Sequence, residues 1–362
     1  MRIHDFRQSY ADDQALWPTR VQRLWLLALL LAIAVFPLVG GGYALGLMCV
    51  LGIHIIAASG LNIMTGSTGL ISLGHAAFMG VGCYTAAWLA QRGLPVFVTL
   101  PAAGLMAAAL GIVVGLPSLR IKGLYLAVAP LAMQFLMVYI FREWDSVTGG
   151  VRGVNVPPAD FFGIPLNTDA RMAWLIAFCA VVMLIGARNL FRTRVGRAFT
   201  AIRDKDISAE VLGINLLQYK LTSFAIGSFY AGVAGALLGY FYRAMTPEYF
   251  TLQLSIFYLA AIIVGGLGST LGTILGAFFM TLVPELLRAG VSLAAQWSPR
   301  AIEILSPIQQ VVFGLLIIGF LVFEPHGLVE VWRRIRRFFH LWPFRSEPRA
   351  ARKPRAAPIH NP

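Results

Sequence analysis

Polar side chains that could take part in chemistry gather in one otherwise apolar stretch of the chain. His54 and His75 bound this stretch. Between them stand hydroxyl and amide residues, namely Ser59, Asn62, Thr65, Ser67, Thr68 and Ser72. A histidine beside a serine can activate a nucleophile, and the same groups can also hydrogen-bond a small solute or join one helix to another. The spacing alone leaves these three uses open.

Glycines surround these residues and indicate what kind of element carries them. They are Gly60, Gly66, Gly69, Gly74, Gly80 and Gly82. Glycine allows close helix contacts and interrupted helices, which a membrane tolerates where the backbone faces protein or a cavity. We therefore expect residues 66–74 to form a broken or loosely wound entry to a helix.

A second glycine-rich stretch, "VGGLGSTLGTILGAFF", occupies residues 264–279. Two such breaks, one in each half of a chain, are typical of a central pathway built from internal pseudo-repeats. The candidate pathway residues are Asn62, Thr65, Ser67, Ser72, His75, Gln134, Gly265, Gly268 and Ser269.

The composition identifies the medium in which these elements lie. Of the 362 residues, 58% are hydrophobic and only 12% are charged, which is typical of a polytopic membrane protein. We predict an all-α transmembrane bundle of about ten spans or part-spans with glycine-broken helices. The expected spans are 24–39, 43–64, 70–90, 94–116, 123–141, 172–190, 217–240, 254–267, 270–287 and 305–323.

Basic residues predict how the bundle is oriented, because cytoplasmic loops are enriched in Lys and Arg. One basic cluster lies in the loop 188–205 and a second in the segment 333–355. Both fall inside if the N-terminus is cytoplasmic and ten spans follow, whereas the loop 142–171 and the turns near 241–253 and 288–304 fall outside. We expect the net charge of +13 to meet anionic membrane lipids, not nucleic acid.

Three regions follow from this layout. Residues 1–23 form a cytoplasmic N-terminal segment and residues 24–342 the transmembrane domain. Residues 343–362 are rich in Pro, Ala and Arg and are expected to form a basic disordered cytoplasmic tail.

Cofactors are not expected in this chain. Cys49, Cys83 and Cys179 lie inside apolar runs without paired Cys or His spacing, so neither a disulfide framework nor a metal site is predicted. The phosphate-binding pattern G-x-x-x-x-G-K-[ST] does not occur, so any ATP must be bound by another polypeptide. The predicted spans also lack a central acidic residue, which counts against a proton- or sodium-coupled carrier.

The loop 191–216 carries a short helix in this interpretation. In "GRAFTAIRDKDISAEVLGIN", residues 196–215, Asp206 is a candidate N-cap, Glu210 lies in the first turn and Gly213 is a natural helix stop, which predicts a helix at 207–212. Apolar contacts are expected from Ala198, Ile202, Ala209 and Leu212. Such a helix can dock into a groove on a cytoplasmic partner, or it can be a linker that lies on the membrane surface.

Several motifs together resemble a known family. They are "GLNIMTGSTGLISLGHAAFMGVGCY" (60–84), "GLYLAVAPLA" (123–132), "TGGVRGV" (148–154), the 196–215 loop, "KLTSFAIGSFYAGVAGALLG" (220–239) and "GGLGSTLGTILGAF" (265–278). The chain resembles the permease subunits of ATP-binding-cassette importers for branched-chain amino acids, specifically the LivM-type subunit. The resemblance covers roughly residues 51–328.

The resemblance implies a role and a set of partners. The chain would be a transport subunit of the bacterial inner membrane and not an enzyme. It would assemble with two ATPase subunits, a second related permease and a periplasmic solute-binding protein, to which the outer loop 142–171 could bind. The loop would be the coupling helix that contacts an ATPase through Arg197, Ile202, Arg203, Asp206, Ala209, Glu210 and Gly213.

Departures from the family pattern leave the solute open. Ile207 replaces the acidic residue of the general importer motif, as is usual in this subfamily, while Pro130 and Thr273 stand where Thr and Pro are common. Urea, short amides or other small organic acids therefore stay alternatives to Leu, Ile and Val. Outside the importer class, a secondary carrier or channel and an intramembrane enzyme using His54 or His75 are the rival interpretations.

Overall fold

The computed structural model describes residues 20–118, 127–161 and 164–295. It also describes residues 311–341 except 313, 316, 320, 321, 323, 325 and 326. The predicted tenth span (305–323) lies mostly outside the described residues, and so does the tail 343–362.

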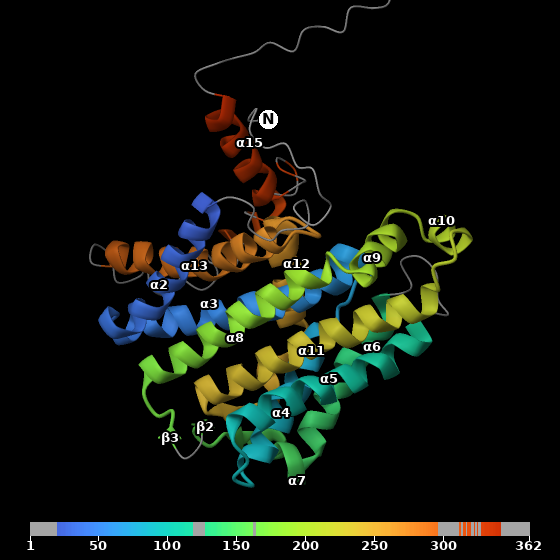
Figure 1. The fold of residues 1–362 in the computed structure, drawn as a ribbon. Coiled ribbons are helices and arrows are strands. Elements are labelled where there is room, and N and C mark those ends of the chain that lie inside the picture. The colour runs from blue at the N-terminus through green and yellow to red at the C-terminus, as the bar shows by residue number, and fades with distance from the viewer. Residues whose placement is uncertain are drawn as a thin grey trace, which may run out of the picture.

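Helices make up nearly all of the described chain (Figure 1). The first half contains α2 (Arg20–Val39), α3 (Gly42–Leu61), the π-helical turn η1 (Asn62–Ser67), α4 (His75–Ala90), α5 (Val96–Ser118), α6 (Val128–Glu143), α7 (Asp145–Thr148) and the 3-10 turn η3 (Gly150–Arg152). The second half contains α8 (Asp169–Leu190), α9 (Arg194–Asp204), α10 (Asp206–Val211), α11 (Leu216–Tyr242), the 3-10 turn η4 (Pro247–Phe250), α12 (Leu252–Gly265), α13 (Thr270–Ala295) and α15 (Leu328–Leu341).

The chain is an all-α polytopic membrane protein, as predicted. Five of the described helical segments are long and apolar enough to cross a membrane, namely Gly42–Ser67, Val96–Pro117, Asp169–Leu190, Leu216–Tyr242 and Thr270–Ala289. Large apolar side chains point outward from the bundle, including Trp25 on α2, Leu105 on α5 and Phe178 on α8, each more than half exposed. Water would penalise such a surface, whereas lipid tails solvate it.

The helix α11 lies at the centre of the bundle and is buried along most of its length. Glycines let it approach its neighbours closely: a Cβ atom on Gly82 of α4 would collide with the backbone of Gly232 on α11. Without a hydrophobic driving force between helices in lipid, such small residues provide the close van der Waals packing that holds the bundle together.

Four short strands lie at one end of the bundle, which we call the strand end. They are β1 (Val154–Asn155), β2 (Asp160–Phe161), β3 (Ile164–Pro165) and β4 (Ala244–Met245). The strands β1 and β4 pair antiparallel, with Val154 opposite Met245, and β2 pairs with β3. This pairing places the long loop after α6 and the turn after α11 at the same end, while α9 and α10 lie at the other, the α10 end (Figure 1).

Two predicted spans agree closely with the apolar parts of their helices. The first apolar segment is Leu24–Val39 and α13 is apolar over Thr270–Ala289, although the helices themselves extend to Arg20 and to Ala295. The α15 segment, which falls within the predicted transmembrane domain 24–342, forms a separate helix whose exposed face alternates Trp332, Ile335 and Phe338 with arginines. Its amphipathic pattern is too polar for a span.

Candidate functional site

The first glycine-rich break is a true interruption of a helix. After Leu61 the helix α3 widens into the π-helical turn η1, and residues 69–74 are not helical, so α4 begins only at His75. Three hydroxyls donate to carbonyls in and beside this interruption: Ser67 donates to Asn62 O at 3.2 Å, Thr68 to Met64 O at 2.5 Å and Thr65 to Leu70 O at 3.0 Å. This is how a membrane protein tolerates an irregular backbone at depth.

The second break separates α12 from α13. Gly266 and Gly268 adopt positive φ angles of 119° and 76°, which end α12 and reverse the direction of the chain before Thr270. The hydroxyl of Ser269 then accepts a hydrogen bond from Gly272 N at 3.2 Å, so that Ser269 caps the start of α13. The predicted interruption at 265–272 is therefore present.

One buried side chain joins the two breaks. Asn62 Oδ1 accepts a hydrogen bond from Gly268 N at 2.8 Å, and Asn62 Nδ2 donates to Ser269 O at 3.3 Å. Asn62 is only 1% exposed, so water does not compete for these bonds. Because an amide offers a donor and an acceptor side by side, it holds the N–H and the C=O of the second break together.

An arginine from the α10 end reaches the same place. Arg203, on α9, donates from Nη1 to Gly66 O at 2.5 Å, and a Cβ atom on Gly268 would collide with the same Nη1. We call the group Asn62, Gly66, Arg203, Gly268 and Ser269 the break cluster. Sequence analysis placed Arg203 with the coupling loop, Asn62, Gly268 and Ser269 with the pathway and Gly66 with the first glycine-rich break, and the structure brings these residues together.

The loop 191–216 contains two helices, not the single one predicted. The helix α9 was missed; Thr193 caps it by accepting from Gly196 N at 3.4 Å. Phe199 and Ile202, on the inner side of α9, are buried against the bundle. The centroid of the Phe199 ring lies 6.5 Å from that of the Tyr219 ring on α11. This packing fixes α9 to the bundle and so fixes Arg203 over the breaks.

The short helix α10 is close to its prediction. It begins at Asp206 instead of Ile207, with Lys205 in the cap position, so Asp206 is the first helical residue and not the N-cap. Gly213 ends it as predicted, at φ +85°. Gly213 N donates to Glu210 O at 2.9 Å and Ile214 N to Ala209 O at 3.0 Å, which is a Schellman motif.

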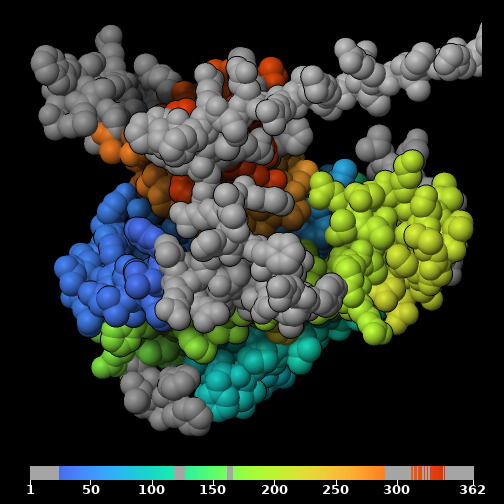
Figure 2. Space-filling model, turned by 45° about the horizontal axis from the view of Figure 1, so that its top comes forward, coloured from blue at the N-terminus to red at the C-terminus, as the bar shows by residue number. Residues whose placement is uncertain are grey.

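The exposed face of α10 differs from the one expected. Ala198, Ile202 and Ala209 are buried within the chain, whereas Leu212 is 80% exposed. Two further apolar residues on α10, Ile207 and Val211, are 75% and 83% exposed. We call Ile207, Val211 and Leu212 the α10 apolar face. In Figure 2 the yellow-green α9–α10 region lies uncovered at the edge of the visible surface.

The other residues of the loop that were expected to contact an ATPase lie on the surface of this segment. Arg197 is exposed and donates from Nη1 to Arg192 O at 3.0 Å, away from the break cluster. Asp206 lies 3.9 Å from Lys220 Nζ at the start of α11, and the Glu210 side chain is exposed. These groups border the α10 apolar face with charge of both signs.

A second polar cluster surrounds the start of α4, deeper in the bundle. Ala77 N donates to Gln134 Oε1 at 2.9 Å and Ala76 N donates to Ser255 Oγ at 2.9 Å, so two side chains from α6 and α12 cap the free N–H groups of α4. Gln134 Nε2 also donates to Phe250 O at 2.6 Å. Ser255 carries no recognisable signal in the sequence and was missed.

His75 is hydrogen-bonded between helices, which was the simpler of the two sequence interpretations. Its Nε2 lies 2.8 Å from Ala57 O on α3, while its Nδ1 is buried without a partner. The nearby Ser72 hydroxyl is also buried and has no partner among the described residues. A serine nucleophile needs a histidine in hydrogen-bond contact, and Ser72 and His75 do not form that contact.

Metal chemistry has no candidate in the described part of the chain, where no three His, Cys, Asp or Glu side chains lie close enough together to hold an ion. The sites are instead hydrogen-bonded joints between helices. Their arrangement suits movement of one segment against another better than bond making or breaking.

Comparison with known proteins identifies the class. The family described as branched-chain amino acid transport system / permease component matches residues 43–321. The high-affinity branched-chain amino acid transport system permease protein LivM of Escherichia coli K12 is 31% identical over 337 residues, covering 86% of this chain and 76% of the relative.

More distant relatives extend the likeness to a second permease type. LivH of the same strain, also named a high-affinity branched-chain amino acid transport system permease protein, is 26% identical over 264 residues, covering 66% of this chain and 83% of the relative. A probable LivM of Methanocaldococcus jannaschii is 25% identical over 239 residues, covering 62% of this chain and 66% of the relative. No solved structure matches the chain.

Proposed function

The chain belongs to the family of permease components of branched-chain amino acid transport systems, and from this premise we propose that it is one membrane subunit of an ATP-driven importer of Leu, Ile and Val. The names of its relatives, which are branched-chain amino acid permeases, support this choice of substrate. The permease acts as a transport subunit, and ATP hydrolysis takes place on separate ATPase subunits.

The break cluster is the observation that supports this mechanism best. Two broken helices meet at Asn62, and Arg203 connects this joint to the α9–α10 segment. We infer that a movement of α10 is passed to both breaks through the Arg203 side chain, which is exposed and hydrogen-bonds Gly66 O. ATP-driven closure of the ATPases would shift α10, and the breaks would rearrange so that the solute path opens toward the other side.

The α10 apolar face provides the contact with an ATPase. Three large apolar side chains on one turn of helix, bordered by charges, fit a hydrophobic groove on a partner protein. The alternative sequence interpretation, a linker helix lying on the membrane, would require these residues to face lipid, whereas α10 lies at the far tip of the segment (Figure 1).

The distribution of charge supports one orientation of the chain in the membrane. Arg192, Arg194, Arg197, Arg203 and Lys205 all belong to the α10 end, so we place that end in the cytoplasm of a bacterial inner membrane. Gly327, just before α15, packs against Gly266 at the second break, which supports a cytoplasmic position for the C-terminal helix as well. The strand end then faces the periplasm, where a solute-binding protein would deliver its ligand.

The second permease would be a LivH-like chain. Relatives named LivM and LivH both align with this chain, and a pair of related permeases supplies one α10-type contact for each of two ATPases. The pseudo-repeat of broken helices within this chain would then line one side of a path shared by both.

Reconstitution tests the proposal. The chain is co-expressed with the LivH-like permease, ATPase and binding-protein genes of its own organism and placed in proteoliposomes. ATP-dependent accumulation of radiolabelled leucine, inhibited by isoleucine and valine, supports it. Accumulation of urea or a short amide instead overturns the substrate, and uptake by the chain alone without ATP overturns the importer mechanism and favours a secondary carrier.

A further inference from the structure

A cavity opens at the strand end, away from the break cluster. Its volume is about 410 Å³, and residues of α3, α11, α12 and α13 line it. This volume lies within the range of small-molecule sites. We call it the outer pocket.

The wall of the outer pocket is mainly apolar. Leu47 and Val50 contribute from α3, Phe257 from α12 and Met280 from α13. Such a wall accommodates an aliphatic side chain of a few carbon atoms.

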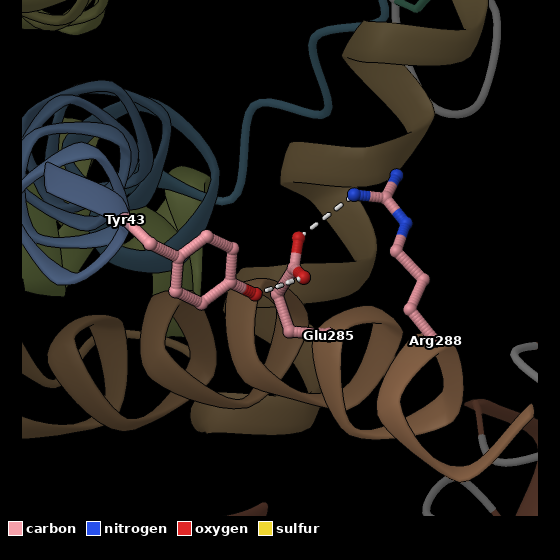
Figure 3. Close-up of polar contacts among 3 residues, drawn as sticks. All are labelled: Tyr43, Glu285 and Arg288. Atoms are coloured by element: carbon pink, nitrogen blue, oxygen red, sulfur yellow. Dashed lines mark hydrogen bonds and ion pairs between the residues drawn. The ribbon is translucent and has the colours of Figure 1, made fainter. Parts of the chain in front are cut away.

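One side of the pocket carries both signs of charge. Arg288 Nη1 lies 2.8 Å from Glu285 Oε1, and Tyr43 donates its hydroxyl to Glu285 Oε2 at 2.6 Å (Figure 3). The Glu285 side chain is 22% exposed and that of Arg288 is 62% exposed. Figure 3 shows the carboxylate between the phenol and the guanidinium, with α3 on one side and α13 on the other.

The pair lies near one end of its helix. Glu285 is fifteen residues beyond the first residue of α13, roughly 22 Å along a helix that starts at the second break. Both residues fall within the last five residues of the apolar segment Thr270–Ala289, so they lie near the end of that segment, at the strand end. A solute that approaches from the strand end can reach a charged pair at this position.

The pocket also connects to the inner polar cluster. His54, on its floor, lies with Nδ1 2.8 Å from the hydroxyl of Tyr258, and the Tyr258 ring packs against the His75 ring with centroids 5.6 Å apart. Polar groups therefore continue from the outer pocket toward the start of α4. A solute that enters at the strand end would meet this row of side chains next.

We propose that the outer pocket binds an aliphatic amino acid in its zwitterionic form, with the ammonium group on Glu285 and the carboxylate on Arg288. The side chain of the amino acid lies against Leu47, Val50 and Met280, and Tyr43 keeps the Glu285 carboxylate in place. In the empty pocket the two charges satisfy each other. This site deepens the proposed function and rests on it, because it assumes that the chain handles amino acids.

Equilibrium binding to the assembled complex, in nanodiscs and without the solute-binding protein, tests the site. Three probes are titrated: leucine, leucinamide, which has no carboxylate, and 4-methylpentanoate, which has no ammonium group. The wild-type complex is expected to bind leucine at least about tenfold more tightly than either analogue. Equal affinity for all three would overturn the proposal.

Charge variants assign the two contacts. Arg288→Gln should weaken leucine binding at least about tenfold and remove the discrimination against leucinamide. Glu285→Gln should also weaken leucine binding at least about tenfold, and it should remove the discrimination against 4-methylpentanoate. Glu330→Gln and Arg333→Gln are matched controls, because Arg333 and Glu330 form an ion pair of the same i,i+3 spacing, 3.5 Å apart, on α15. These controls should leave all three affinities unchanged.

The double variant Glu285→Arg with Arg288→Glu separates binding from structure. It restores an ion pair on α13 but reverses the charges relative to the apolar wall. If the pair binds the ligand, leucine affinity stays low although the partners still co-purify; if the pair is only structural, affinity recovers and the proposal is wrong.

Failure of the site and failure of the proposed function give different results. ATP-driven leucine uptake with binding unaffected by Glu285→Gln and Arg288→Gln overturns the site and leaves the function in place. A wild-type complex that imports no branched-chain amino acid contradicts the function, and charge-dependent leucine binding in that complex would still support the site.

Discussion

Asn62 and Gly268 are 206 residues apart in the chain, and a buried 2.8 Å hydrogen bond joins them. The bond connects the break after α3 with the break after α12, and the Asn62 amide also reaches the carbonyl of Ser269. Neither break is therefore free to change its conformation alone. A device that must open two helices together requires such a joint.

Removing the Asn62 amide should uncouple the two breaks. Asn62→Ala deletes both bonds and leaves Gly268 N without a partner, a loss of about 1–3 kcal/mol. We expect ATP-driven uptake in proteoliposomes to fall by roughly tenfold or more. Asn189→Ala, at an exposed asparagine near the end of α8, is the control and should transport normally. Equal uptake by both variants would contradict the role of Asn62.

The α10 apolar face should be required for binding of the ATPase. Ile207→Asp combined with Val211→Asp places charge on two side chains that are more than 70% exposed and therefore not needed for folding of this chain. We expect the ATPase subunits to be lost on co-purification. Gln218→Asp puts the same charge at an exposed position of the neighbouring helix α11, outside the apolar face, and should retain them. Retention by the double variant as well would show that the ATPase binds elsewhere.

Gly213 should tolerate only residues that adopt a left-handed conformation. Its φ is +85°, and an added Cβ would meet nothing within 4 Å, so backbone strain and not crowding determines the effect. Gly213→Val should cost about 1–2 kcal/mol at this cap and reduce uptake, whereas Gly213→Asn should remain close to wild type. Uptake measured side by side checks this, and an equal loss in both variants would point to crowding by a partner instead.

The inner cluster should contribute to stability. Gln134→Leu keeps most of the side-chain volume but removes the donor to the carbonyl of Phe250 and one of the two acceptors of the Ala77 N–H, which still donates to Gly74 O, at a cost of about 1–3 kcal/mol. The thermal midpoint of the detergent-solubilised complex should fall. Gln218→Leu, at an exposed position of α11, is the matched control. An unchanged midpoint for Gln134→Leu would mean that water replaces the amide.

Local signals predicted much of this structure. The helix α10, its glycine stop and the two glycine-rich breaks follow from capping and backbone preferences within a few residues. The helices α9 and α15 were missed because runs of arginine occur both in cytoplasmic loops and on the polar face of amphipathic helices. The arginines were used only to predict cytoplasmic loops.

Contacts between distant segments could not be predicted. Nothing in the sequence indicates that Arg203 reaches Gly66, or that Ser255 and Gln134 cap α4, because each is a single polar residue whose partner is backbone. A backbone partner leaves no matching residue type to recognise. The outer pocket was missed for a different reason: Tyr43 and Glu285 meet through their side chains, but they lie 242 residues apart.

The central claim is that Arg203 transmits the movement of α10 to the breaks. The most direct measurement is the ratio of leucine imported to ATP hydrolysed by proteoliposomes containing Arg203→Met, compared with Arg194→Met, which removes an exposed arginine at the first position of α9. We predict that Arg203→Met keeps its ATPase subunits and hydrolyses ATP but imports roughly tenfold less leucine per ATP, while Arg194→Met behaves as wild type. A normal ratio in Arg203→Met would contradict the account.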